Sequence, residues 1–232
     1  MPNDAPASSV RGLHHVTAMA GDPSTNLAFY TDTLGLRLVK RSVNQDAPEI
    51  YHLFYADADG SPGTDLTFFP NPGMPRGTRG VGQIVEVAFS IPEGSLAYWA
   101  DRLAAHDVPC SDRETRFGEI ALPFQDPDGM HLALIETARP MDVALWDESP
   151  VPATHQLRGM HSVRLWEREL EPTERLLTDA MGLQKAGTDG DWHRYGLSDG
   201  RPSTIADVRI HPDGPRGRGG AGVIHHAAWR TP

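Results

Sequence analysis

Short apolar stretches recur along the chain, and four of them follow a glycine in a similar setting. Strands are expected to begin after Gly12, Gly82, Gly159 and Gly222. Apolar runs of this length between turn residues are typical of buried strands. Because the four segments resemble one another and recur at similar intervals, the chain is predicted to consist of a repeated unit.

A helical pattern follows the first strand in each of the first three units. In the first unit Asp22 is the expected N-cap, Pro23 takes the first helical position and Gly35 ends the helix. The second unit carries an Ala-rich helix over Leu96–His106, and Gly182 in the third unit corresponds to Gly35. Each unit therefore continues from strand to helix.

Three further strands complete each unit. Asp-Gly pairs, which favour hairpin turns because glycine adopts positive φ, occur at Asp59-Gly60, Asp128-Gly129 and Asp199-Gly200. The last strands are expected over Thr64–Phe69, Met130–Thr137 and Ser203–Ile210. The predicted fold class is α+β, built from repeated βαβββ units with mixed sheets.

The domain organisation follows from where this pattern stops. Between the second and third units, Pro140, Pro150 and Pro152 interrupt the periodicity. The prediction is two units within residues 1–140 (about 12–70 and 81–138), a linker at 141–156, and a third unit plus the first strand of an incomplete fourth over 157–232.

Composition narrows the class of protein. The 232 residues carry 31 acidic and 21 basic side chains, a net charge of −10, which argues against a nucleic-acid partner. No apolar run is long enough for a membrane helix, and Met1–Ser9 lacks the features of a signal peptide. The single cysteine, Cys110, excludes an internal disulfide framework and a cysteine-rich zinc site. The predicted location is the cytoplasm.

Histidine pairs distinguish the outer units from the inner ones. His14-His15 opens the first unit and His225-His226 the fourth, whereas the inner units carry Ile84-Val85 and His161-Ser162 at the positions taken as equivalent. The remaining single histidines have no partner at ligand spacing and are expected to lie at the surface or to be hydrogen-bonded: His52, His106, His131, His155, His193 and His211.

Equivalent strand positions point to equivalent faces, so His15 and His226 should converge if the first and fourth units pack as a pair. Two imidazoles and one carboxylate form the facial triad of non-haem iron(II), which leaves positions open for a substrate and O2. The alternative is a pair of core or hydrogen-bonded histidines on neighbouring strands.

These residues carry a resemblance to a known family. The sequence resembles the vicinal oxygen chelate superfamily, and within it the ring-cleaving dioxygenases that open hydroquinones. The matching segments are Gly12–Thr17, Asp22-Pro23, Leu34–Lys40, Ser42–Asp46, Tyr51–Tyr55, Gly60–Pro70 and His225–Trp229.

The resemblance implies a fold and a site. The family fold is four βαβββ modules whose sheets form open cups. Its metal is usually iron(II), with manganese(II) as the alternative, and the ligand positions correspond to His15 and His226. The residues that the family places around the substrate correspond to His14, Thr17 and His225, although strict strand alternation would point both histidines away from the metal.

The family's third ligand is a glutamate on the last strand of the fourth module, which is expected beyond residue 232. Neither Glu136 nor Asp65 is expected to replace it. The sequence therefore leads us to expect that the natural protein extends past Pro232 and that the 232-residue form alone has little dioxygenase activity.

The implied function is an extradiol-type dioxygenase that acts on a hydroquinone or catechol-like phenol, with a small aromatic substrate and O2 as its partners and a homo-oligomer left open. Two alternatives remain on the same fold: a glyoxalase-like, metal-dependent isomerase or lyase, and a non-enzymatic protein that binds a quinone or drug. The identity of a bound metal discriminates between the three.

Overall fold

The computed structural model describes residues 10–232; the polar stretch Met1–Ser9, for which the sequence predicts no signal peptide, lies outside them. The strands are β1 (Leu13–Ala20), β2 (Arg37–Val43), β3 (Tyr51–Ala56), β4 (Asp65–Pro70), β5 (Gln83–Pro92), β6 (Glu114–Arg116), β7 (Glu119–Gln125), β8 (His131–Thr137), β9 (Met160–Glu167), β10 (Gln184–Asp189), β11 (Trp192–Gly196), β12 (Ile205–Ile210) and β13 (Ile224–Trp229). The helices are α1 (Pro23–Ala28), α2 (Leu96–Ala105) and α3 (Glu171–Arg175), with π-helical turns η1 (Phe29–Thr33) and η2 (Leu176–Ala180) continuing α1 and α3.

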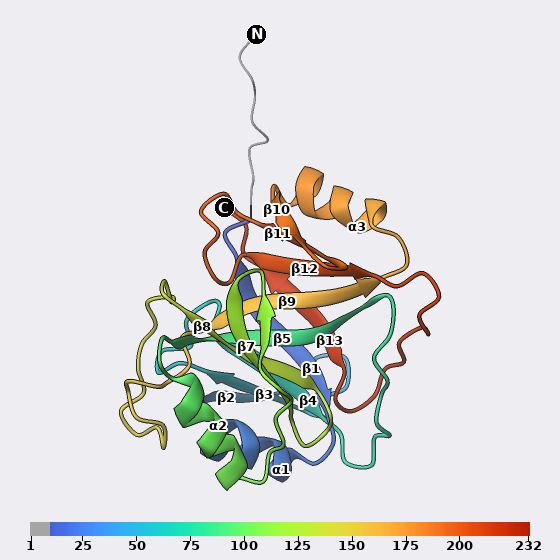
Figure 1. The fold of residues 1–232 in the computed structure, drawn as a ribbon. Helices are drawn as coiled ribbons and strands as arrows, with labels where there is room; N and C mark the ends of the chain where they lie inside the picture. The colour runs from blue at the N-terminus through green and yellow to red at the C-terminus, as the bar shows by residue number, and fades with distance from the viewer. Residues whose placement is uncertain (1–9) are drawn as a thin grey trace.

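The order of elements confirms the predicted repeat. Strand, helix and three strands occur three times in succession, and β13 follows alone (Figure 1). The first helix begins as expected, because the Asp22 side chain accepts a hydrogen bond from the Thr25 amide at 2.8 Å. No helix within residues 10–232 combines the length and apolar composition that crossing a membrane requires.

The strands form two curled, mixed sheets. The five-stranded sheet has the order β13-β1-β4-β3-β2, and the eight-stranded sheet has the order β10-β11-β12-β9-β5-β8-β7-β6. The first unit is thus paired with the start of the fourth, and the second unit with the third. Each sheet draws strands from both sides of the irregular segment 141–156.

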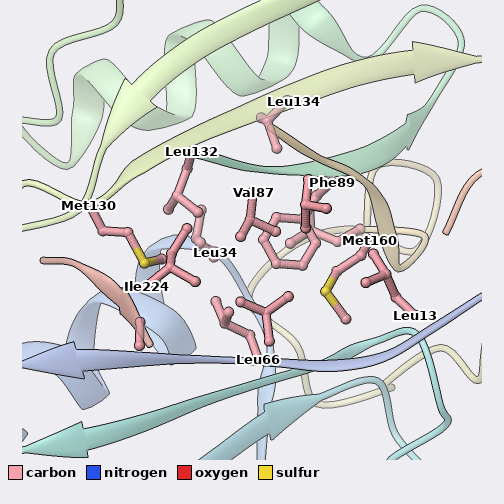
Figure 2. Close-up of a cluster of buried hydrophobic side chains, with 14 of the residues drawn as sticks. Leu13, Leu34, Leu66, Val87, Phe89, Met130, Leu132, Leu134, Met160 and Ile224 are labelled. Atoms are coloured by element: carbon pink, nitrogen blue, oxygen red, sulfur yellow. The ribbon is translucent and has the colours of Figure 1, made fainter. Parts of the chain in front are cut away.

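The main hydrophobic core lies between the two sheets. Figure 2 shows side chains from the five-stranded sheet facing side chains from the eight-stranded sheet. The first group includes Leu13, Leu66 and Ile224, and the second includes Val87, Phe89, Leu132, Leu134 and Met160. The opposite face of each sheet therefore points away from this core, and we call these faces the first cup (five-stranded sheet) and the second cup (eight-stranded sheet).

Truncating a side chain between the sheets should destabilise the whole protein. Leu66 is fully buried, so we expect Leu66→Ala to lower the free energy of unfolding by about 2–5 kcal/mol through lost contacts and a residual cavity. Leu176→Ala is the matched control, because this leucine is 56% exposed and should change stability by less than about 0.5 kcal/mol. Urea unfolding measures both, and equal effects would contradict this account of the core.

Candidate metal and substrate site

Antiparallel pairing of β1 with β13 brings the two histidine pairs together. Thr17 lies opposite His226, and His15 lies opposite Ala228. The Nε2 atoms of His15 and His226 are 3.1 Å apart, and their rings are nearly perpendicular, at 79°. The convergence expected from the repeat is thus observed, whereas the role of these histidines as metal ligands stays a prediction.

The first histidine of each pair occupies a β-bulge. Between Leu13 and His15 strand β1 advances by two residues while β13 advances by one, so His14 is an extra residue. On β13 the extra residue is His225, because Thr17 and Ala18 pair with His226 and Ile224. Bulges re-aim side chains and interrupt alternation, which explains why neither ring points to the far face of the sheet as strict alternation would require.

Both re-aimed rings contact their neighbours. His14 Nδ1 lies 3.0 Å from His15 Nδ1, and His225 Nδ1 lies 2.8 Å from His226 Nδ1. In each pair one Nδ1–H donates to the other Nδ1. If His15 and His226 are the donors, their Nε2 lone pairs face the same point, which is the arrangement that metal-binding histidines usually have with an outer hydrogen-bond partner.

Electrostatics keep the two candidate ligands neutral. Burial lowers the pKa of His15 to about 4, and the rings of His226 and His14 add to the shift. Burial also lowers the pKa of His226, with a smaller contribution from His225. Neutral imidazole is the form that binds metals, so both rings are ready to act as ligands at neutral pH.

A chain of hydroxyl groups links this pair to a third histidine. The fully buried Thr17 hydroxyl lies 3.1 Å from His226 Nε2 and 2.7 Å from the Thr67 hydroxyl, with which it pairs across β1 and β4. Thr67 Oγ1 lies in turn 2.9 Å from His52 Nε2 on β3. Burial and then the His15 and His226 rings lower the pKa of His52 to about 4.

His52 is hydrogen-bonded, as expected of a single histidine, but its partner Thr67 connects it through Thr17 to the His15–His226 pair, a link that the sequence did not reveal. Aromatic rings surround His52: the ring centroids of Phe54 and Phe69 lie 4.0 and 4.4 Å from that of His52. The alternation of His52 and Phe54 along β3 was the available sequence signal. This alternation indicates that His52 and Phe54 lie on the same face of β3, but it does not predict that His52 contacts Thr67 on β4.

The two carboxylates considered at the sequence level have separate surroundings. Asp65 lies opposite His15 in the β1–β4 register, and burial raises the pKa of its carboxyl to about 7. Glu136 Oε1 instead accepts a hydrogen bond from the Leu96 amide at the start of α2. In the part of the chain that the structure describes, no group of three His, Cys, Asp or Glu side chains is placed to hold a metal.

The strand register corrects one equivalence. In the five-stranded sheet, Thr17 on β1 pairs with His226 on β13 and with Thr67 on β4. In the eight-stranded sheet, Ala88 on β5 pairs in the same way with Ser162 on β9 and Ala133 on β8, so Thr17 and Ala88 are equivalent. Counting back two residues, His15 corresponds to Glu86 rather than to Val85. Val85 is the extra residue of a bulge in β5 and so corresponds to His14. Spacing along the sequence missed this shift by one residue.

A histidine titration tests the electrostatic description. In metal-free protein the ring C–H signals of His15 and His52 should report a pKa near 4 by NMR, because burial disfavours the charged form. The urea-unfolded chain is the control, where histidine titrates near its ordinary value of about 6.5. Because the unfolded chain binds protons first, the folded protein should lose stability as pH falls from about 6.5 to about 4. Titration of both rings near the ordinary value in the folded protein would contradict the description.

Asp65→Asn should stabilise the metal-free protein at alkaline pH. The folded pKa of about 7 exceeds the unfolded value, so stability decreases as pH rises from about 4 to 7, and an uncharged amide avoids that loss. We expect a gain of about 1–2 kcal/mol at pH 8 and a smaller one at pH 4.5, by urea unfolding. Asp101→Asn, at an exposed position on α2, is the control. If Asp65→Asn gains no more stability at pH 8 than at pH 4.5, the raised pKa of Asp65 is contradicted.

The chain is similar to known proteins over most of its length. The family model described as "Glyoxalase/Bleomycin resistance protein/Dioxygenase superfamily" matches residues 12–134. The chain is 39% identical over 225 residues to the Bacillus subtilis (strain 168) protein named "Putative ring-cleaving dioxygenase MhqO", covering 97% of this chain and 71% of that protein. It is 35% identical over 227 residues to the Sphingobium indicum "Chlorohydroquinone/hydroquinone 1,2-dioxygenase", with 96% and 71% covered.

Solved structures show the same fold. A crystal structure described as a putative dioxygenase from Bacillus subtilis aligns with a TM-score of 0.87 at 37% identity, covering 95% of this chain and 70% of that one. Glyoxalase I from Zea mays aligns with a TM-score of 0.69 at 18% identity, with 97% and 75% covered, which shows the fold alone. The predicted class of repeated βαβββ units is therefore confirmed, and the chain belongs to the glyoxalase/bleomycin resistance protein/dioxygenase superfamily.

Proposed function

We propose that this protein is a ring-cleaving dioxygenase that opens a hydroquinone or catechol-like phenol with O2, in the extradiol manner, at a non-haem iron(II) or, alternatively, manganese(II). The observation that carries the proposal is the 3.1 Å approach of the His15 and His226 Nε2 atoms. Its support is that relatives covering almost the whole chain are named as ring-cleaving and hydroquinone dioxygenases.

The donor set fits a divalent metal. Two imidazole nitrogens that bind one metal at about 2.0–2.1 Å and at right angles lie about 3 Å apart, which matches the observed separation. Both rings are neutral at pH 7, and the Nδ1 atom of each has a partner. When bound, such a metal supplies Lewis-acid activation of a phenol hydroxyl beside O2.

The outer histidines would hold protons at defined atoms. If His14 and His225 accept at Nδ1, each neutral ring carries its hydrogen on Nε2. Both residues are exposed. We therefore assign the Nε2–H groups as donors to the substrate oxygens. The buried Thr17 hydroxyl lies beside His226 Nε2 and would hold this ring in place in the metal-free protein, until a metal takes up the Nε2 lone pair.

The wall beyond the histidines suits an aromatic substrate. Phe54 and Phe69 flank His52. The rings of Phe69 and His225 pack edge to face, with their centroids 6.0 Å apart. Lys40 Nζ lies 5.2 Å from the centre of the Phe54 ring. Aromatic walls with a few fixed polar groups are typical of small-molecule sites, so we expect a phenol ring to pack beside Phe54 and Phe69.

A role in the degradation of aromatic compounds and a cytoplasmic location belong to the same proposal. The first follows from the substrate class. The second is supported by the lone Cys110, since proteins that use disulfide frameworks reside in oxidising compartments.

The test is metal binding and oxygen uptake. We expect His15→Ala to lower bound iron at least tenfold, because one of two neutral ligands is lost, and to remove whatever uptake of O2 with hydroquinone the parent protein shows. His106→Ala, at the exposed C-terminus of α2, is the control and should retain both. Unchanged iron content in His15→Ala would refute the ligand role. Conversion of substrate without O2 uptake by the parent protein would favour the isomerase or lyase alternative.

A further inference from the structure

The second cup contains a cavity that the histidine site does not use. It has a volume of about 440 Å³ and lies on the face of the eight-stranded sheet that points away from the main core. Its lining includes Arg79, Glu86, Arg116, Arg164, Trp166 and Trp192. The volume falls within the range of small-molecule sites, about 300–1,000 Å³.

Ion pairs in this cavity satisfy only some of its cations. Arg116 binds Glu86 through two contacts, at 2.5 and 3.1 Å, and its Nε contacts Glu114. Arg164 lies farther from both acids, with its Nη1 4.0 Å from Glu86 and 3.6 Å from Glu114. These two carboxylates are therefore committed mainly to Arg116.

Three donor groups remain without an acceptor among the described residues. Arg164 is only 8% exposed, its guanidinium lies 3.5 Å from the centre of the Trp192 ring, and its Nε–H has no partner. The indole N–H of Trp166 is likewise buried and unpartnered. Arg79, whose guanidinium lies 5.0 Å from the centre of the Trp166 ring, makes no hydrogen bond or ion pair with residues 10–232.

These donors share one region of the cavity. Arg164 and Trp166 are two residues apart on β9 and therefore project from the same face of the sheet. Arg79 is the cation beside Trp166. Two other lining groups, by contrast, already have partners: Arg209 pairs with Asp191 at 3.2 Å, and Asp189 accepts the Phe117 amide at 2.7 Å.

Guanidinium and indole N–H groups can only donate, so their complement is an acceptor, and two arginines favour an anion. A buried donor without a partner is unfavourable, and a planar guanidinium matches a carboxylate. Apolar surface from Val85, Pro123 and Trp192 adjoins these groups, which suits a flat organic body better than a small inorganic ion.

We propose that the second cup binds a small planar organic carboxylate, whose oxygens accept hydrogen bonds from Arg79, Arg164 Nε and Trp166 Nε1 and whose body packs beside Trp192. This inference is independent of the proposed ring cleavage, because the histidine site lies on the other sheet.

Benzoate is the probe, with benzamide as its uncharged analogue and inorganic phosphate as an anion without a planar body. Isothermal titration should show benzoate binding at least about tenfold more tightly than either, since loss of one charge-assisted contact costs about 1.4 kcal/mol or more. In a 15N-labelled sample, benzoate should shift the indole signal of Trp166. The signal of Trp99 should stay in place, because its N–H already donates to the His155 carbonyl.

Two variants locate the site. Arg79→Gln removes a cation that makes no hydrogen bond or ion pair with residues 10–232, and Trp166→Phe removes the N–H while keeping an aromatic ring. Each should weaken benzoate at least about tenfold, a loss of about 1.4 kcal/mol. Arg175→Gln, at a 72% exposed arginine on α3, is the matched control and should bind benzoate like the parent protein.

Three results would overturn the proposal. If benzoate binds no more tightly than benzamide, the site does not require a negative charge on its ligand. If phosphate binds as tightly as benzoate, the site does not select a planar organic ligand. Unchanged benzoate affinity in both Arg79→Gln and Trp166→Phe would place the anion elsewhere. Circular dichroism of each variant shows whether it is folded, and weaker binding by a folded variant supports the proposal.

Discussion

The antiparallel pairing of β1 with β13 joins two segments whose key histidines are 211 positions apart in the chain. One face of this pair contributes Leu13 and Ile224 to the core between the sheets, and the other presents His15 and His226. Because side chains alternate along a strand, a shift of one residue would exchange these faces. Leu13 and His15 are two residues apart, as are Ile224 and His226, so the bulges at His14 and His225 are what turn one residue of each pair to the core and the other to the cup. The same bulges place His14 and His225 beside their neighbours, so the four rings form one cluster.

Much of this arrangement could be predicted from the sequence. Glycine-bounded strands, the Asp22 cap and the Asp-Gly turns are local signals, and they predicted the repeated unit correctly. The convergence of His15 and His226 followed from the repeat. The one-residue shift from Val85 to Glu86 could not be found in this way, since a bulge adds a residue without changing the apolar pattern. The place of His52 was missed because its partner Thr67 comes from another strand.

The same unit produces two cups whose central side chains differ in charge. In the first cup the central pair is two neutral imidazoles, and in the second the corresponding positions hold Glu86 and Ser162. A carboxylate in the second cup requires a cation, and Arg116 provides it in the buried interior. Breaking such a pair leaves an uncompensated charge. A few side chains at equivalent strand positions thus give the two cups different chemistry, which is the basis for proposing a metal in one and an organic anion in the other.

The sequence separation of β1 and β13 also has a consequence during protein synthesis. Strand β1 emerges from the ribosome early, whereas β13 follows only after the whole eight-stranded sheet has been made. At about 5–20 residues per second, one side of β1 waits roughly 10–40 s for its partner. During that interval its backbone groups are open to pairing with other nascent chains. The histidine cluster is then among the last parts of the described chain to assemble, so binding of the proposed metal would report that folding is complete.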